Sequence, residues 1–218
     1  YHNNGKVRFK TVYKKGAASG EVVYFEKDGK PWAVYVFDKN DIKSARFLDA
    51  NGKEIGSSVA KNNKLQLIVY NQNGTKASEK FYNEKGYQTG TETVYYPNGS
   101  VRTVINYKDG ELHGKYTGYF LNGKKDYEYS YAEGVKDGYY YGYHLNGKVA
   151  SEGWYKDGIM TGDWYYYDNH GKLKTKAYYL NGDLEGYKED YYPTGHKHVE
   201  QYHHLGWFVD NTLYDTLG

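Results

Sequence analysis

The sequence predicts an all-β protein: an elongated, single-layer, twisted antiparallel sheet of about nine stacked β-hairpin repeats, arranged as a solenoid-like meander. Three observations predict it. Turn glycines recur at a nearly constant interval, aromatic residues recur at fixed positions between them, and no segment has the apolar spacing of an amphipathic helix. The interval is 24 residues between Gly99, Gly123, Gly147, Gly171 and Gly195. Each repeat therefore needs to contact only its neighbours.

One repeat, residues 146–169, shows the expected elements in order. It contains an Asn-Gly turn, a mixed polar strand, a Gly-x-x-x-Gly turn and the aromatic strand WYYY. Asn-Gly favours a tight hairpin turn because both residues tolerate positive φ. We expect two strands of about 6–8 residues in each repeat, with neighbouring hairpins paired antiparallel.

The whole chain reads as one repeat array with a divergent zone. In that zone Asn40 and Ser44 replace the glycine pair, and Ala60 takes an aromatic position. We interpret the zone as divergent repeats or a bend, where two sub-arrays join. The regions of the array are residues 1–37 (regular), 38–72 (divergent), 73–193 (regular) and 194–218 (C-terminal cap).

Composition limits the partners of the chain. Tyrosine contributes 30 residues and glycine 27, and tyrosine rings can hold together a thin sheet while their hydroxyls stay in water. Lys and Arg total 29 and Asp and Glu 27, a net charge of +2 with alternating signs. We therefore expect no nucleic-acid partner. No apolar run approaches the roughly 18 residues of a membrane helix, so we expect no direct membrane insertion.

The aromatic strand 164–167 places rings on both faces of the sheet, because side chains alternate along a strand. Trp164 and Tyr166 should face one side, and Tyr165 and Tyr167 the other. Most rings should hold the sheet together, and a minority should form a surface for sugar rings or partner side chains. The residues predicted for this interaction surface are Trp154, Trp164, Tyr165, Tyr167 and Trp207.

Histidines gather in the cap. His196 and His198 would share one face of a strand, and an adjacent strand would bring His203 or His204 near them, a set that suits zinc or nickel. No carboxylate stands at a spacing that completes such a site. We therefore expect structural or surface histidines and no metal or other cofactor.

No arrangement of residues points to catalysis. The chain has no cysteine, no Ser-His-Asp pattern, no recurring carboxylate pair and no dinucleotide fingerprint. A single-layer sheet offers grooves and not an enclosed pocket. We expect no enzymatic activity. A specific site is expected where the repeat fails, at residues 38–72 or in the cap after Thr194.

The pattern Tyr155-x-x-Gly158-x-x-x-Gly162-x-x-x-x-Tyr167-x-x-x-Gly171 resembles the MORN (membrane occupation and recognition nexus) repeat. The Asn-Gly-Lys turn and the 24-residue period are similar to its bacterial variant, often called YwqK-like. The resemblance is clear over residues 98–193 and poor over 38–72. It implies stacked hairpins and a scaffold or assembly role. Lipid binding is proposed for some members, and bacterial variants are sometimes labelled antitoxins.

These observations predict a non-catalytic repeat scaffold for protein–protein interaction or assembly in a bacterial cell envelope. One alternative is a carbohydrate or cell-surface glycan-binding module, motivated by the aromatics. Another is an antitoxin or immunity-type partner protein, implied by the resemblance alone. The chain opens inside a repeat at Tyr1 without Met. We therefore expect an upstream export signal or lipoprotein leader, and a cell-envelope or secreted location in preference to a cytoplasmic one.

Overall fold

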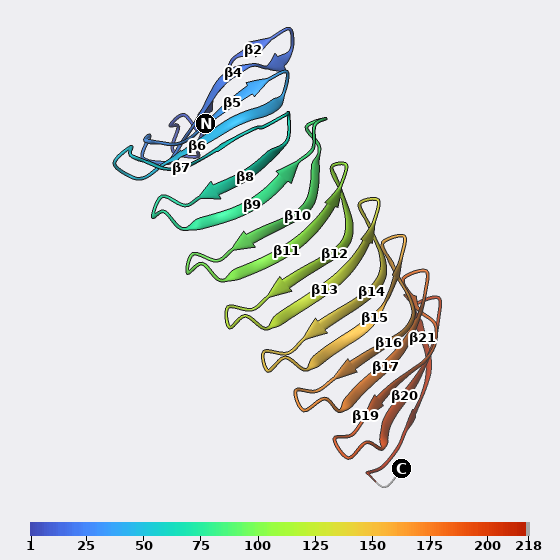
Figure 1. Ribbon diagram of the computed structural model, residues 1–218. Coiled ribbons are helices and arrows are strands. Elements are labelled where there is room, and N and C mark those ends of the chain that lie inside the picture. Colours follow the sequence, from blue (N-terminus) through green and yellow to red (C-terminus); the bar gives the residue numbers. More distant parts are fainter. Residues whose placement is uncertain (217–218) are drawn as a thin grey trace. The chain divides into compact units, whose positions relative to one another are not determined.

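The computed structural model describes residues 1–216 of the 218-residue chain. These residues form strands and turns, and no helix occurs among them. The predicted all-β antiparallel meander is confirmed. The chain forms two compact units, Tyr1–Glu111 and Leu112–Gly218, and Figure 1 shows that the strands of each follow one another in chain order. The predicted cap, 194–218, includes residues 217–218, which lie outside the described range.

Unit 1 holds a five-stranded antiparallel sheet, four strands of a second sheet, and a small hairpin. The first sheet has the order β1 (Phe9–Lys10), β4 (Gly20–Phe25), β5 (Pro31–Asp38), β6 (Asp41–Leu48), β7 (Glu54–Val59). The second begins with β8 (Leu65–Tyr70), β9 (Lys76–Tyr82), β10 (Gln88–Tyr95) and β11 (Val101–Lys108). The hairpin pairs β2 (Tyr13–Lys14) with β3 (Ala17–Ala18).

Unit 2 is an antiparallel meander in which nearly every strand pairs with the strands before and after it in the chain. Its strands are β12 (Glu111–Tyr119), β13 (Lys125–Ala132), β14 (Val135–Tyr143), β15 (Val149–Lys156), β16 (Ile159–Tyr167), β17 (Leu173–Leu180), β19 (Gly186–Tyr191), β20 (Lys197–His204) and β21 (Trp207–Leu213). The short β18 (Asp183–Leu184) pairs with β17, which also pairs with β19.

The hydrogen-bonded ladder of unit 1 is interrupted between β7 and β8. The interruption lies inside the zone 38–72, where the sequence repeat diverges. Here the bridge between Lys61 and Lys64 closes a tight turn whose central residues, Asn62 and Asn63, have φ values of 51° and 59°. Asparagine enters this left-handed region more readily than most residues, so the chain reverses here without a glycine.

The main buried cluster of unit 1 lies beside this interruption. Strands β5 and β6 of one sheet and β8 of the other contribute Ala33, Ala45, Phe47, Leu65 and Leu67. Phe47 has no exposed surface, and its ring contacts those of Trp32, Tyr35 and Tyr70. The ring of Tyr70 occupies the place where a Cβ on Gly56 would stand. The two sheets of this unit thus share a dry aliphatic and aromatic core.

Unit 2 is held together by rings on one face, which we call the ring-packed face. Trp164 is only 3% exposed. Its indole stacks 5.4 Å from the ring of Tyr140 and meets that of Tyr155 edge-on at 5.3 Å. A Cβ on Gly153 would clash with the indole, so the missing side chain on β15 lets Trp164 lie against the backbone.

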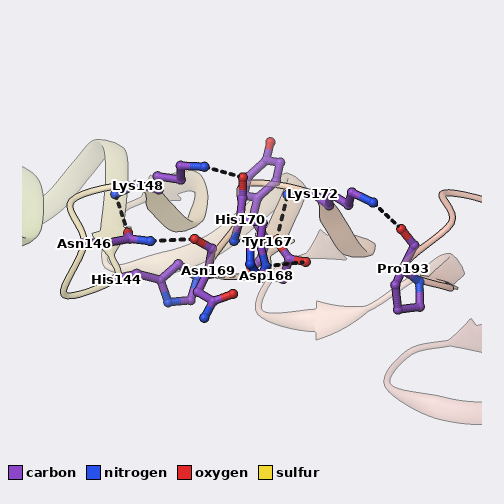
Figure 2. A network of polar contacts seen from close by, with 9 residues as sticks. All are labelled: His144, Asn146, Lys148, Tyr167, Asp168, Asn169, His170, Lys172 and Pro193. Atoms are coloured by element: carbon purple, nitrogen blue, oxygen red, sulfur yellow. Dashed lines mark hydrogen bonds and ion pairs between the residues drawn. The ribbon is translucent and has the colours of Figure 1, made fainter.

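The Asn-Gly turns form a ladder along one edge of the sheet (Figure 2). Asn146 Oδ1 accepts a hydrogen bond from Lys148 N within its own turn, while Asn146 Nδ2 donates to the carbonyl of Asn169 in the next. Lys148 Nζ donates to the carbonyl of His170 at 2.6 Å. Lysines 6, 30, 124 and 172 likewise donate to a carbonyl in the following turn. The Asn-Gly-Lys sequence therefore joins successive repeats.

The opposite edge has its own ladder, made by backbone groups. The amides of Gly110, Gly134, Gly158, Gly182 and Gly206 each donate to a carbonyl in the first two residues of the strand that follows the preceding turn of this edge. These glycines have φ between 80° and 94° and are each preceded by a residue that is also left-handed. The paired left-handed residues make the tight reversal that a twisted hairpin needs.

Candidate interaction surface

The cross-strand register defines a second face of unit 2, which we call the open face. Tyr165 lies opposite Glu152 and Lys176 on this face, whereas Trp164 lies opposite Ala177 on the ring-packed face. The predicted division of the strand 164–167 between two faces is confirmed. Tyr167 also belongs to the open face, because its hydroxyl donates to Glu152 Oε1 at 2.6 Å.

The residues predicted for the interaction surface separate accordingly. Trp154, Tyr165 and Tyr167 lie on the open face. Trp207 begins β21 and is 79% exposed. Trp164 is buried, so its assignment to an accessible surface is wrong. Neighbouring rings cover the indole on one side and the backbone at Gly153 covers it on the other.

Five exposed rings cross the open face, one per strand, on β14, β15, β17, β19 and β20. This aromatic row consists of Tyr139, Trp154, Tyr178, Tyr187 and Tyr202, each between 36% and 57% exposed. Tyr139 is opposite Trp154, with ring centroids 4.5 Å apart, and Tyr187 is opposite Tyr202 at 5.1 Å. The row offers a line of rings on a rigid hydrogen-bonded support.

Two carboxylates lie in line with the row. Asp163 on β16 is opposite Tyr178, and Asp210 on β21 is opposite Tyr202. The Asp163 side chain is half exposed and lies 3.8 Å from Lys176 Nζ, a loose ion pair. Asp210 is exposed and accepts a hydrogen bond from the amide of Asn211. The row therefore combines aromatic faces with accessible negative charge.

Polar side chains beside the row pair with one another. Burial raises the pKa of Glu189, but hydrogen bonds from Lys197 and Tyr191 outweigh it, and the net pKa lies below the ordinary value. For Tyr167, burial and then the bond to Glu152 raise the pKa. At neutral pH these groups are held as paired ions and neutral phenols.

Two hollows lie near the places where the sequence repeat fails, one at the zone 38–72 and one at the cap. One, of about 700 Å³ in unit 1, lies beside the interruption between β7 and β8 and is lined by residues that include Val59, Leu65, Gln66 and Phe81. The other, of about 270 Å³ in unit 2, lies at the end of the aromatic row. Its lining residues are Tyr187, Glu200, Tyr202, Val209, Asp210, Asn211 and Thr212.

The cap histidines have separate environments. His196 is exposed in the turn before β20, and His198 stacks on Tyr192 at 4.3 Å. His203 packs against Phe208, and neither of its buried ring nitrogens has a hydrogen-bond partner. His204 Nδ1 lies 2.9 Å from Glu185 Oε1. Across residues 1–216, no three His, Asp or Glu side chains gather as metal ligands would.

Of the aromatic row, only Trp154 was predicted, although the 24-residue period also marks the positions of other members. Trp154, Tyr178 and Tyr202 are successive members of one 24-residue series, and Tyr139, Asp163 and Tyr187 form another. Reading both series together with strand alternation would have placed all six on one face. Exposure would still have required the structure, because Tyr155 and Tyr179, one position further along, belong to the ring-packed face.

Comparison with known families supports the repeat assignment in part of the chain. A family model described as "MORN repeat variant" matches residues 88–109, 112–133 and 160–181. The similarity to this family covers these three segments. Such repeats are generally modules of protein or membrane interaction, and the proteins built from them are generally not enzymes. No curated protein matches the chain.

Similar solved structures include an S. aureus TarM mutant in complex with fondaparinux, alpha-GlcNAc-glycerol and UDP. It is 12% identical with a TM-score of 0.33, over 50% of this chain and 21% of that one, so this chain spans about a fifth of its length. A Bacteroides fragilis protein with unknown function is 12% identical with a TM-score of 0.12, over 97% and 95% of the two chains. Neither likeness is close enough to carry an argument.

No helix within the described part of the chain is long and apolar enough to span a membrane.

Proposed function

We propose that this chain is a non-catalytic repeat scaffold that binds another protein through the open face of unit 2. The observation that carries this proposal is the aromatic row. Its five rings lie on the open face and are each between 36% and 57% exposed. Tyrosine and tryptophan are the residues enriched in the energetic centres of protein interfaces. A line of such rings, exposed to water along one face, therefore marks a docking site.

The ring-packed face supplies the contrast. There, Trp164, Tyr140 and Tyr155 contact one another and hold the strands together. The rings of the aromatic row pack in pairs but keep much of their surface in water. The sheet thus has one face for stability and one face available for a partner.

We assign the array to the bacterial, YwqK-like form of the repeat, with a 24-residue period and a cell-envelope or secreted location. Support comes from the Asn-Gly-Lys turns, whose Asn and Lys side chains join successive repeats. This ladder supplies order along one edge of the sheet.

The test compares the proteins that the intact chain and a variant capture from an extract of the native source. We expect the intact chain to retain a partner that the triple variant Tyr139→Ser, Trp154→Ser, Tyr187→Ser loses. The control is Tyr13→Ser, which removes an exposed ring from unit 1. Equal capture by the intact chain and the triple variant, with both folded by circular dichroism, would contradict the proposal.

A second function, glycan binding, is favoured by the hollow at the end of the row. There the rings of Tyr187 and Tyr202 stand beside Asp210 and Thr212, and ligand sites combine aromatic faces with a few polar groups in this way. On a glycan array we expect a hit that Asp210→Ala abolishes. An array without hits would remove this function and leave the protein-binding proposal standing.

A further inference from the structure

The partner of the aromatic row can be described by its conformation. We propose that the row binds a proline-rich peptide of a partner protein in the polyproline II conformation, running across the strands with one peptide turn per repeat. This inference rests on the proposed function and names the chemistry of the partner for the same surface.

The first argument is the match of two periods. Neighbouring strands lie about 4.8 Å apart, so two strands advance the sheet by about 9.6 Å per repeat. A polyproline II helix rises about 3.1 Å per residue with three residues per turn, or about 9.3 Å per turn. Trp154, Tyr178 and Tyr202 are equivalent positions of successive repeats. Every third residue of such a peptide would therefore meet an equivalent ring.

Other regular conformations do not share this period. An α-helix has a pitch of about 5.4 Å, so its residues would fall out of step with the rings within one repeat. An extended strand pairs through its backbone at a sheet edge, whereas the aromatic row lies on a face, supported by strands that are already paired on both sides. The row thus selects for a ligand that needs no backbone pairing.

The second argument is the chemistry of the row. Proline rings pack well on flat aromatic faces, and aromatic-lined grooves are the usual docking sites of proline-rich segments. A polyproline II helix leaves its backbone carbonyls without internal hydrogen bonds. The Tyr139 and Tyr187 side chains, each more than half exposed, present phenol groups that can donate to those carbonyls.

The third argument is charge complementarity. Asp163 and Asp210 lie in line with the row on β16 and β21, which are four strand steps apart in the sheet order. Four steps are about 19 Å, close to six residues of polyproline II. We therefore expect the partner segment to carry prolines at every third position and two basic residues six positions apart.

The experiment measures binding of synthetic peptides to the full chain by isothermal titration calorimetry. The test peptide has prolines at every third position over four turns and two arginines six residues apart. The matched peptide has the same composition with prolines at every fourth position. We expect the first peptide to bind at least about tenfold more tightly, a difference of about 1.4 kcal/mol.

Variants locate the binding. We expect Tyr178→Ala, Tyr187→Ala and Asp163→Asn each to weaken the first peptide about three- to tenfold, and Tyr13→Ala in unit 1 to leave it unchanged. The effect of Asp163→Asn should shrink as salt is raised, because its interaction with arginine is screened. Circular dichroism of each variant separates lost binding from lost fold.

Equal affinity for the two peptides, or an affinity unaffected by the row variants, would overturn the inference. So would a row that binds a glycan and neither peptide. If the triple variant loses its natural partner while neither peptide binds, the proposed function stands and only the polyproline II inference fails.

Discussion

The surroundings of Phe47 in unit 1 and of Trp164 in unit 2 show two ways of burying a large ring in a thin protein. Phe47 lies between two sheets, among Ala33, Ala45 and the leucines of β8. Trp164 lies on a single sheet, against the backbone at Gly153 and under neighbouring tyrosines. The second arrangement pairs Gly153 with Trp164, which stand where the preceding repeat has Tyr129 and Tyr140. The first appears where the repeat diverges and the ladder is interrupted.

The difference shows what a glycine on a neighbouring strand provides. Glycine on one strand and a ring on the next can bury that ring without a second layer. Where glycines and tyrosines are replaced, as in the zone 38–72, burial needs aliphatic residues from another sheet. Both regions nevertheless place a ring over a glycine, since Tyr70 covers Gly56 as Trp164 covers Gly153.

The largest effect should come from Phe47→Ala. Removing a fully buried ring leaves a cavity, and such changes cost about 3–5 kcal/mol. We expect the loss in urea unfolding, with faster hydrogen exchange in β5, β6 and β8 and unchanged exchange in β14–β16. The control is Phe9→Ala, which removes a half-exposed ring. Faster exchange of both units alike would show that the two regions are not energetically separate.

Gly153→Ala should destabilise unit 2 by about 1–3 kcal/mol, the usual cost of adding a group to a filled site. The added methyl would meet the Trp164 ring, so the ring must tilt or the strands must separate. The matched measurement is the same change in a Trp164→Leu background, where we expect less than half the cost. An equal cost in both backgrounds would mean that the backbone, and not the indole, opposes the methyl.

Alkaline pH should weaken unit 2 more than unit 1. Burial, and then the neighbouring Tyr140, raise the pKa of Tyr129 to about 12, and burial first also raises the pKa of Tyr155 and Tyr166. A phenol with a raised folded pKa contributes stability that is present below its unfolded value near 10 and is lost as pH rises through the folded value.

The measurement is hydrogen exchange of each unit between pH 9 and 12, with tyrosinate absorbance alongside (an interval set by the reference tyrosine pKa of about 10). We expect Tyr129→Phe to reduce the alkaline loss in unit 2, because phenylalanine does not ionise. An alkaline loss that is equal in the two units would argue against the ring-packed face as the titrating element.

The smallest effect should come from the turn ladder. Lys148→Ala removes one hydrogen bond to the His170 carbonyl, which is worth about 0.5–1 kcal/mol because the carbonyl can turn to water. Lys174→Ala, at an exposed position of β17, is the control and should change stability less. Thermal unfolding of both variants measures these changes in stability. A larger loss of stability for Lys174→Ala than for Lys148→Ala would show that the turn ladder does not stabilise the protein.

Local features of this protein were predictable, and cross-strand features were not. Turn glycines and the division of Trp164 from Tyr165 follow from period and alternation, and both are seen in the structure. The burial of Trp164 depends on Gly153 of β15, whose missing side chain leaves room for the indole, and this placement requires the register of β15 and β16. The core around Phe47 joins strands of two sheets. It therefore cannot be predicted from a local pattern in residues 38–72.

The turn ladders also give the array a direction. Along one edge, lysine and asparagine side chains reach forward to the next turn. Along the other edge, glycine amides donate back to the start of the strand that follows the preceding turn. A repeat duplicated in tandem meets both sets of partners already in place, whereas an inverted copy meets neither. The architecture is therefore suited to evolve in length by whole-repeat duplication, and each duplication would extend the aromatic row by one step.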